Sequence, residues 1–384
     1  MATQKRKFHV LVVVRWPVGG IRTFLRYVYC RFPVDRFKFI FIYPETSESR
    51  AIKSDLQHLD INYVMISKFP SVMEFTRIVY RCLRKFSIDI LHSHGFTSGV
   101  CSVIPAKLTG TPHLMTSHDV FTKKQFQGVT GVVKKQFLSS FFQKIDLIHC
   151  VSFDAKENLL AYLPVLKKNA NQVVVILNGI ESKRFLTNER KDFRLKYKLE
   201  DNIFLIGFFG RFMSQKGFRF LVQAVEILQK RSLPKKVMVF CFGWGGFVRE
   251  EQTVLKQKGL ADFFVFLPFQ DNIASYLRGL DVVAMPSLWE ACGLLAMESM
   301  VAGIPLIGTD CVGLREVIKN TPAYMIPPRD ANALADAIEK EIRTPSKEEV
   351  ERFRATAALR FDVKKQEVAL RGIIEDLCKQ SREI

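Results

Sequence analysis

Two glutamates eight positions apart, Glu290 and Glu298, are the residues whose type and spacing point most directly to chemistry. Glu290 closes a short loop after an apolar strand, and Glu298 falls inside the helix that follows. The start of that helix, around Gly293 and Leu294, should expose unpaired backbone N–H groups, which are a ready site for a phosphate. One carboxylate can then bind one end of an anionic ligand while the other binds its far end. This arrangement suits a nucleotide sugar, which has hydroxyls at both ends and a diphosphate between them.

A second group of candidates follows the apolar run 203–209. Gly210 permits a tight turn there, and Arg211 and Lys216 are placed to reach into the site. A departing nucleoside diphosphate needs either a divalent metal or fixed cations to stabilise its growing charge. The chain has no Asp-x-Asp, the usual metal-binding signature of metal-dependent sugar transfer. We therefore expect no metal and assign the role to Arg211 and Lys216, although each alone could be a solvated surface charge.

The first half offers weaker candidates. Gly19 and Gly20 follow the first expected strand and could let the backbone approach a phosphate or an acceptor, but a plain tight turn explains them equally well. His118 follows the strand expected at 113–117, where it could hydrogen-bond a sugar hydroxyl or a developing charge, or be structural. His94 follows the strand expected at 88–92 and could border the cleft, but we favour a structural role for it.

Short apolar runs alternate with helical stretches along the whole chain, which is typical of parallel sheets covered on both faces. The expected strands are 8–14, 37–43, 61–66, 88–92, 113–117, 145–150, 173–177, 203–209, 237–242, 263–267, 281–285, 305–308 and 323–326. The expected helices of the second half are 216–231, 248–258, 272–278, 294–302, 313–319, 330–343, 347–358 and 362–380. We predict two doubly wound, Rossmann-like α/β domains that face each other across a cleft. Their bounds are 1–178 and 201–360, with a polar linker at 179–200 and a final helical segment at 361–384.

Charge is distributed unevenly. Residues 1–175 carry 25 Lys and Arg against 11 Asp and Glu, whereas residues 176–384 carry 32 against 27. A basic first half implies an anionic partner such as a phospholipid, a lipid diphosphate or a nucleic acid. Lysines and phenylalanines alternate over 121–144, which could form a surface for an anionic membrane or merely the solvated face of a helix over an ordinary core. The eight cysteines show no Cys-x-x-Cys pair and no zinc spacing, so we expect reduced thiols in a cytoplasmic protein.

The sequence resembles the retaining glycosyltransferases of family four, which have the GT-B fold, over nearly its whole length. The most specific match is the Glu-x7-Glu motif from Glu290 to Glu298, with Pro286-Ser287 before it and Ala302-Gly303-Ile304-Pro305 after it. Gly210-Arg211 with Lys216-Gly217 is the second specific match. Supporting matches are Asn178-Gly179-Ile180 with Phe185, Asp281, and Gly19-Gly20. Departures are Ala291-Cys292 within the motif and Gly243-Trp244-Gly245-Gly246 after the strand 237–242, where acidic contacts to the donor are expected and missing.

The resemblance implies a role for each matching residue. Arg211 and Lys216 would hold the donor diphosphate, Glu290 the hydroxyls of the donor sugar, and Glu298 those of the ribose. His118 would face the donor sugar, and the last helix would return to the first domain. The backbone of the segment after Glu290 would contact sugar and phosphate, through Cys292, Gly293 and Leu294.

We therefore expect a retaining, metal-independent glycosyltransferase. It would use a UDP- or GDP-linked nucleotide sugar and a saccharide or lipid-linked acceptor, in lipopolysaccharide or other cell-surface polysaccharide synthesis. Its place would be peripheral, on the inner face of the cell membrane. Two alternatives stay open: an epimerase or hydrolase of nucleotide sugars on the same fold, which a product assay separates, and a basic nucleic-acid-binding protein. We expect no nucleic acid partner, because such a protein explains the net charge of +19 but not the two glutamates.

Overall fold

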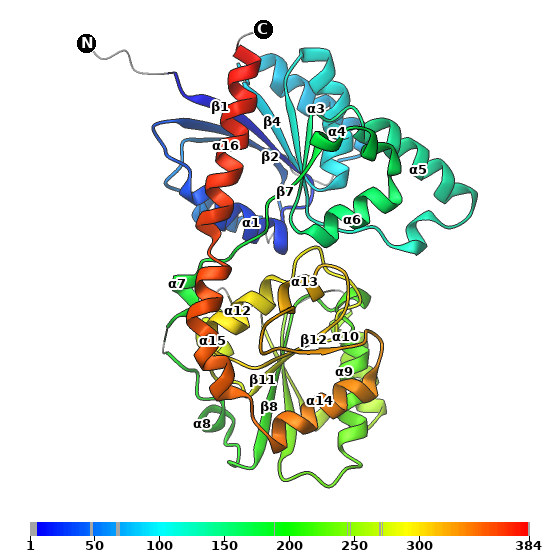
Figure 1. The fold of residues 1–384 in the computed structure, drawn as a ribbon, viewed down its shortest axis with the longest axis vertical. Helices are drawn as coiled ribbons and strands as arrows, with labels where there is room; N and C mark the ends of the chain where they lie inside the picture. Colours follow the sequence, from blue (N-terminus) through cyan, green and yellow to red (C-terminus); the bar gives the residue numbers. More distant parts are fainter. Residues whose placement is uncertain are drawn as a thin grey trace. The chain divides into compact units, whose positions relative to one another are not determined.

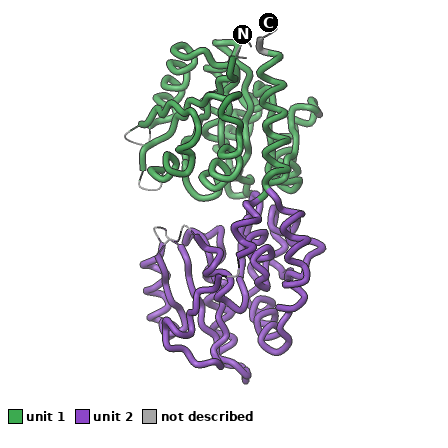
Figure 2. The backbone as a smooth tube through the Cα atoms, turned by 90° about the vertical axis from the view of Figure 1, so that its left-hand side faces the viewer, with its two compact units in different colours: residues 1–179, 363–384 green, residues 180–362 purple. Residues whose placement is uncertain are grey.

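A computed structural model of the chain describes residues 6–46, 49–66, 70–187, 189–243, 245, 247–268, 270 and 272–382. The chain forms two compact units, residues 1–179 with 363–384 and residues 180–362, which Figure 2 distinguishes by colour. Each is an α/β unit built on a parallel sheet, so the predicted fold class is confirmed.

Unit 1 contains a seven-stranded sheet within its described residues. Its strands, in spatial order, are β3 (Ile61–Ile66), β2 (Phe37–Pro44), β1 (Phe8–Val14), β4 (Ile90–His94), β5 (His113–Ser117), β6 (Leu147–Cys150) and β7 (Val173–Val175). Every pairing is parallel. Its helices are α1 (Gly20–Val28), α2 (Ala51–Asp55), α3 (Val72–Lys85), α4 (Phe96–Thr109), α5 (Gly128–Phe142), α6 (Phe153–Tyr162) and α16 (Val363–Arg382), and Figure 1 labels most of these elements.

Both faces of this sheet are covered, as continuously apolar strands require. Leu11 and Val13 of β1 pack with Phe75 and Val79 of α3 in one core cluster. α16 packs against α1 and β4, so the last helix belongs to unit 1, as predicted (Figures 1 and 2).

Unit 2 contains a six-stranded parallel sheet within its described residues. In spatial order the strands are β10 (Phe264–Leu267), β9 (Lys236–Phe242), β8 (Ile203–Phe209), β11 (Val282–Met285), β12 (Leu306–Thr309) and β13 (Tyr324–Ile326). The helices are α7 (Ser182–Phe185), α8 (Phe193–Tyr197), α9 (Phe218–Leu228), α10 (Val248–Gln257), α11 (Ala274–Leu277), α12 (Leu294–Ala302), α13 (Arg315–Ile318), α14 (Ala331–Arg343) and α15 (Lys347–Arg360). α9 and α14 cover one face, where their apolar residues join β8 in a single core.

The segment expected to be a polar linker, 179–200, is instead mostly part of unit 2. Arg194 of α8 donates to the Ile203 carbonyl at 2.7 Å and to Asp281 Oδ2 at 3.1 Å. The same Asp281 oxygen accepts the Leu205 N–H at 2.8 Å. Hydrogen bonds to β8 and to Asp281 therefore hold in unit 2 a charged stretch that composition alone marks as a connection.

The boundary between the units lies between Gly179 and Ile180, one residue after the predicted end of the first domain. Gly179 N–H donates to Gln366 Oε1 at 2.9 Å, and Gln366 Nε2 donates to Asn178 Oδ1 at 2.6 Å. The side chain of one α16 residue thus fastens the last residues of the first segment of unit 1 to that helix.

Candidate active site

Two charged candidates of unit 2 that lie 74 residues apart in sequence meet in space. Lys216 ends a 3₁₀ turn after β8 (Ser214–Lys216), and its Nζ lies 2.7 Å from Oε1 of Glu290, which follows β11. Their side chains are 24% and 8% exposed, so this ion pair is largely shielded from water. Because β8 and β11 are neighbours in a parallel sheet, the loops after them emerge at the same edge.

A glycine sets the conformation of the Lys216 loop. The expected helix 216–231 begins only at Phe218, because Gly217 has φ 66°, a left-handed value that interrupts it. A Cβ built on Gly217 would overlap the carbonyl oxygen of Pro286. The backbone of the Lys216 loop therefore touches the loop that carries Glu290, and only glycine fits at this approach.

Two hydrogen bonds of Gln215, one accepted and one donated, join the same two loops. The Leu288 N–H donates to the Gln215 carbonyl at 2.8 Å, and Gln215 Nε2 donates to the Trp289 carbonyl at 2.9 Å. Lys216 is thus held next to Glu290 by its neighbours on both sides.

The Glu290 carboxylate has further support. Ser287 Oγ donates to Glu290 Oε1 at 2.7 Å, and Thr309 Oγ1 at the end of β12 donates to the Ser287 carbonyl. The Glu290 N–H donates to the Val312 carbonyl at 2.9 Å. Both side-chain donors found among the described residues converge on Oε1, which leaves Oε2 to accept from a ligand.

Arg211 is half-buried and lies in the same loop as Lys216. Gly210 precedes it, and the Gly210 N–H donates to the Phe242 carbonyl at 2.9 Å. A Cβ on Gly210 would come 3.3 Å from Lys216 Cε, so the loop packs closely on the lysine stem. Within the described part of the chain, the Arg211 guanidinium has no ion pair or hydrogen bond. Two residues of the neighbouring loop, Trp244 and Gly246, lie outside the described residues.

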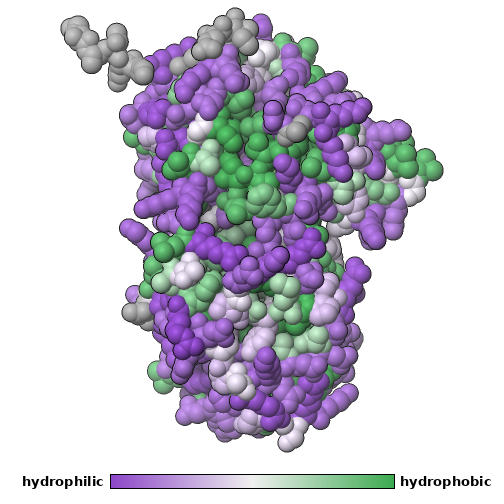
Figure 3. Space-filling model, in the orientation of Figure 1, coloured by the Kyte–Doolittle hydropathy of each residue, from purple (hydrophilic) through white to green (hydrophobic). Residues whose placement is uncertain are grey.

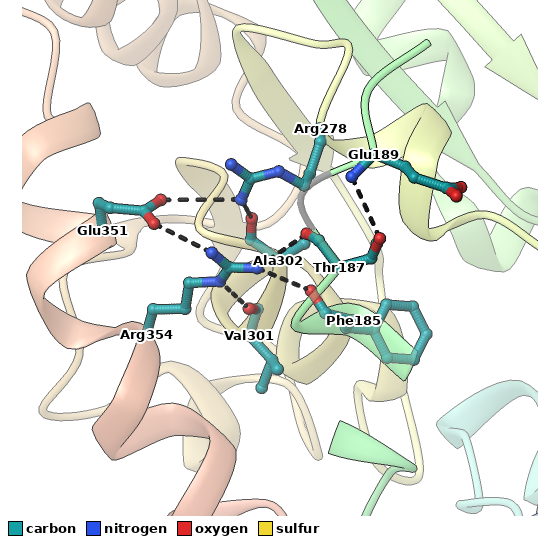
Figure 4. Close-up of polar contacts among 8 residues, drawn as sticks. All are labelled: Phe185, Thr187, Glu189, Arg278, Val301, Ala302, Glu351 and Arg354. Carbon is teal, nitrogen blue, oxygen red and sulfur yellow. Dashed lines mark hydrogen bonds and ion pairs between the residues drawn. The ribbon is translucent and has the colours of Figure 1, made fainter. Parts of the chain in front are cut away.

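Glu298 lies in α12 and is 7% exposed. The far end of this helix is anchored by two arginines: Arg354 Nε donates to the Val301 carbonyl at 2.8 Å, and Arg278 Nη1 to the Ala302 carbonyl at 2.7 Å (Figure 4). Cations at a helix C-terminus satisfy its last carbonyls and complement its dipole. Figure 4 shows Arg354 also reaching the carbonyls of 185 and 187, so α12 is tied to α7 and α15.

The start of α12 differs from the expectation of unpaired N–H groups. The Gly293 N–H donates to the Gly313 carbonyl at 3.3 Å, and the Leu294 N–H donates to the Cys292 carbonyl at 3.0 Å. The loop after β12 folds over the motif and supplies the first acceptor, which the local sequence of the motif does not reveal. A phosphate could therefore bind the Gly293 and Leu294 N–H groups only if these groups gave up their present carbonyl acceptors.

The remaining candidates belong to unit 1. Gly19 has φ 58° and caps α1, whereas a Cβ on Gly20 would meet no atom within 4 Å. Only Gly19 thus has a conformational reason to be glycine. His118 follows β5 and is half-buried, with its Nε2 3.0 Å from His94 Nδ1 and its ring edge-on to Phe24.

Sequence reasoning missed the residues that support these candidates. Thr309 and Gly313 come from the strand and loop after the motif, and no local pattern links them to Glu290. Tyr29 and Thr116 hydrogen-bond histidines in unit 1 and were likewise not singled out. The described residues contain no group of three or more His, Cys, Asp or Glu that could hold a metal ion, and none of their helices is long and apolar enough to cross a membrane.

Comparison with known proteins agrees with this architecture. Residues 18–184 match the family model "Glycosyltransferase Family 4", and residues 203–343 match "Glycosyl transferases group 1". The Anabaena protein HepE in complex with UDP-glucose superposes with a TM-score of 0.79 at 19% identity, over 96% of this chain and 99% of that one. The fold is therefore that of the GT-B glycosyltransferases.

Sequence relatives narrow the class. An Escherichia coli UDP-Gal:alpha-D-GlcNAc-diphosphoundecaprenol alpha-1,3-galactosyltransferase is 25% identical over 68% of each chain. An uncharacterized glycosyltransferase of Methanocaldococcus jannaschii is 30% identical over 66% of this chain and 65% of its own. The chain belongs to glycosyltransferase family 4.

Proposed function

We propose that this chain is a retaining, metal-independent glycosyltransferase that moves a sugar from a UDP- or GDP-linked donor to a hydroxyl of a saccharide or lipid-linked acceptor. The observation that carries the proposal is the shielded Lys216–Glu290 pair, whose lysine shares the loop after β8 with Arg211, a residue that has no ion pair or hydrogen bond among the described residues. A cation held next to a carboxylate, with a second cation in the same loop, is what a leaving diphosphate and a neighbouring sugar hydroxyl require. The names of the relatives that bind UDP-glucose or use UDP-Gal support a nucleotide sugar as donor.

Each charged residue has a distinct role in this proposal. Lys216 and Arg211 stabilise the charge that develops on the departing diphosphate, in a site where water does not compete. Glu290 accepts hydrogen bonds from the donor sugar through Oε2, and Glu298 accepts them from the ribose. Backbone groups of the Cys292–Leu294 segment border the sugar and the phosphate. In unit 1, the Gly19 turn and His118 serve the donor or the acceptor.

Retention follows in this proposal from attack on the face that the diphosphate leaves. The bond from the acceptor oxygen to the anomeric carbon forms as the bond from that carbon to phosphate breaks, and the acceptor proton passes to the leaving phosphate oxygen. A double displacement needs a carboxylate free to attack carbon. Lys216 and Ser287 bind Oε1 of Glu290, and in this proposal Oε2 accepts from the donor sugar, so neither oxygen serves as the nucleophile.

We expect sugar transfer that does not depend on a metal. The protein, incubated with EDTA and a panel of UDP- and GDP-sugars together with lipid-diphosphate and saccharide acceptors, should form a new glycosidic bond with the anomeric configuration of the donor, read by NMR of the product. Activity that vanishes with EDTA and returns with manganese would contradict the cationic mechanism. Release of free sugar alone, or of an epimerised nucleotide sugar, would favour a hydrolase or an epimerase.

We further propose that α5 brings the protein to an anionic membrane, where a lipid-linked acceptor would lie. Its exposed apolar residues recur at helical spacing: Val129, Val132, Val133 and Phe137 are 81%, 55%, 60% and 47% exposed. Figure 3 shows hydrophobic residues gathered at the projecting edge of unit 1, where Figure 1 places α5. Lysines flank them at 123, 124, 134 and 135, and such a combination of apolar and basic residues favours the surface of anionic lipid.

Replacing both Val132 and Val133 by serine should reduce sedimentation with phosphatidylglycerol vesicles by at least about fivefold, since each buried valine contributes on the order of 1 kcal/mol or more to membrane partitioning. Binding to phosphatidylcholine vesicles should be weak throughout. Leu195→Ser, which alters a 79% exposed side chain of unit 2, is the matched control. Equal binding of both variants and the wild type would show that α5 is not the contact.

A further inference from the structure

A continuous series of hydrogen bonds runs through the interior of unit 1 behind His118. Its first half lies around Tyr29, whose hydroxyl is 2.6 Å from His92 Nδ1 and 3.0 Å from His94 Nε2. His94 Nδ1 is in turn 3.0 Å from His118 Nε2. These groups form the outer half of a hydrogen-bonded series that extends from His118 inward. We term the whole series the histidine chain.

The second half begins at the other nitrogen of His92. His92 Nε2 lies 2.7 Å from Thr116 Oγ1, and the same oxygen lies 3.0 Å from His149 Nδ1. His149 Nε2 lies 2.9 Å from the Ile176 carbonyl oxygen, where the histidine chain ends. Three histidines, a tyrosine and a threonine thus connect a buried carbonyl to His118.

The rings of the histidine chain are neutral. His92, His94 and His149 are no more than 1% exposed, and burial lowers the pKa of each below its ordinary value, to about 4 for His149. Burial also lowers the pKa of His118, to about 3. A neutral imidazole carries one N–H and one bare nitrogen, so each ring donates through one nitrogen and accepts through the other.

The carbonyl at the inner end fixes the direction of every bond. Ile176 O can only accept, so His149 must carry its proton on Nε2, and His149 Nδ1 must accept from the Thr116 hydroxyl. Thr116 has no second proton, so its oxygen must accept from His92 Nε2–H. His92 Nδ1 is then bare and accepts from the hydroxyl of Tyr29.

The same reasoning continues outward. The Tyr29 hydroxyl donates its single hydrogen bond to His92 Nδ1, so the same oxygen must accept from His94 Nε2–H. His94 Nδ1 is then bare and must accept from His118 Nε2–H. No described residue hydrogen-bonds the Nδ1 atom of His118, which is the group left over at the half-buried end.

We infer that the histidine chain holds His118 in the Nε2–H tautomer, so that this residue presents a bare Nδ1 as a hydrogen-bond acceptor. Tyr29, Thr116, His92, His94 and His149 are positioning residues that act through His118. Such a nitrogen accepts a hydrogen bond from a donor such as a hydroxyl and disfavours an ionised phosphate oxygen, which only accepts. The assignment of a sugar or acceptor hydroxyl as that group rests on the proposed function, whereas the tautomer does not.

The tautomer can be measured in the free protein. Long-range ¹H–¹⁵N correlation NMR of uniformly ¹⁵N-labelled protein at pH 7 distinguishes a protonated ring nitrogen from a bare one, and loss of signals in His118→Gln assigns the ring. We expect a single Nε2–H tautomer for His92, His94, His118 and His149. An Nδ1–H tautomer or an even mixture at His118 would overturn the inference, whether or not the protein transfers sugar.

Breaking the chain tests its control over His118. Tyr29→Phe removes the hydroxyl between His92 and His94, so His94 and His118 should become mixtures of the two tautomers. Thr116→Val breaks the chain between His149 and His92, so the tautomers of His92, His94 and His118 should all become mixed. Ser93→Ala is the matched control: Ser93 is fully buried in the same strand as His92 and His94, but its hydroxyl bonds His113 at 2.8 Å, outside the chain. Unchanged His118 tautomers in both Tyr29→Phe and Thr116→Val, with wild-type circular dichroism, would contradict the inference.

The hydroxyl preference has a separate readout. If His118 accepts from a ligand hydroxyl, His118→Ala should weaken binding of that ligand by about five- to tenfold, the usual contribution of one neutral hydrogen bond. The deoxy analogue that lacks this hydroxyl should bind the wild type and His118→Ala equally. A set of deoxy analogues that all discriminate between the two proteins would exclude this role for His118 and leave the tautomer measurement standing.

Discussion

Replacing Lys216 by alanine should lower the turnover of sugar transfer at least ~100-fold, because it removes a fixed cation from the place where the leaving diphosphate gains charge. The same variant leaves Glu290, whose side chain is 8% exposed, without its ion-pair partner. A lone carboxylate so shielded from water is costly, so the melting temperature should also fall. Steady-state kinetics with saturating donor, together with thermal unfolding, separates the two effects.

Glu290→Ala should cause a loss of similar size, and the double variant should be little worse than either single one. Residues that act as a unit give strongly non-additive effects. The 2.7 Å contact between Lys216 Nζ and Glu290 Oε1 predicts such coupling. Multiplicative losses in the double variant would mean that the two residues act independently.

Lys258→Ala is the matched control for the lysine. Its Nζ is also 2.8 Å from a glutamate, Glu226, but both side chains are about two-fifths exposed, at 40% and 37%. Exposed ion pairs contribute about 0–1 kcal/mol, and this one is outside the candidate site, so turnover should stay within twofold of the wild type. A wild-type rate for Lys216→Ala would remove this lysine from the mechanism.

The sheets could be predicted because their cause is local. A parallel strand covered on both faces reads as a run rich in apolar residues, so 8–14 and 203–209 were expected with the bounds that β1 and β8 have. The bounds of β3 and β5 were also predicted, although no residue of β3 is buried and β5 contains three polar residues. The predicted start of α9, at residue 216 instead of Phe218, was wrong for an equally physical reason. Its left-handed Gly217 is set by contact with Pro286, and a single sequence does not reveal such a tertiary approach.

The candidate site was only partly predictable. Lys216 and Glu290 were singled out by residue type and by position after strands, but their ion pair depends on β8 and β11 being neighbours, which follows from topology. Ser287 and Thr309 act through single hydrogen bonds that leave no periodic trace in the sequence. The histidine chain shows the same limit more strongly, since its members come from three strands, β4, β5 and β6, and from the turn after α1, and each ring taken alone is an ordinary buried histidine.

Gly217→Ala should destabilise the protein by at least about 2 kcal/mol and lower turnover at least ~10-fold, although it touches neither substrate nor ion pair directly. An alanine at φ 66° is strained by about 1 kcal/mol, and its Cβ would overlap the Pro286 carbonyl, so the loop must move. Movement of that loop displaces Lys216 from Glu290, and small misplacements of charged groups are costly for catalysis.

Gly259→Ala separates the clash from the backbone strain. Gly259 also has φ 66°, but a Cβ there meets no atom within 4 Å. It should therefore lose only the backbone term, about 1 kcal/mol, and keep wild-type turnover. Chemical denaturation and kinetics of the two variants side by side give the comparison. If Gly217→Ala and Gly259→Ala lose equal stability and both keep full activity, the packing of the Lys216 loop against Pro286 does not hold the ion pair in place.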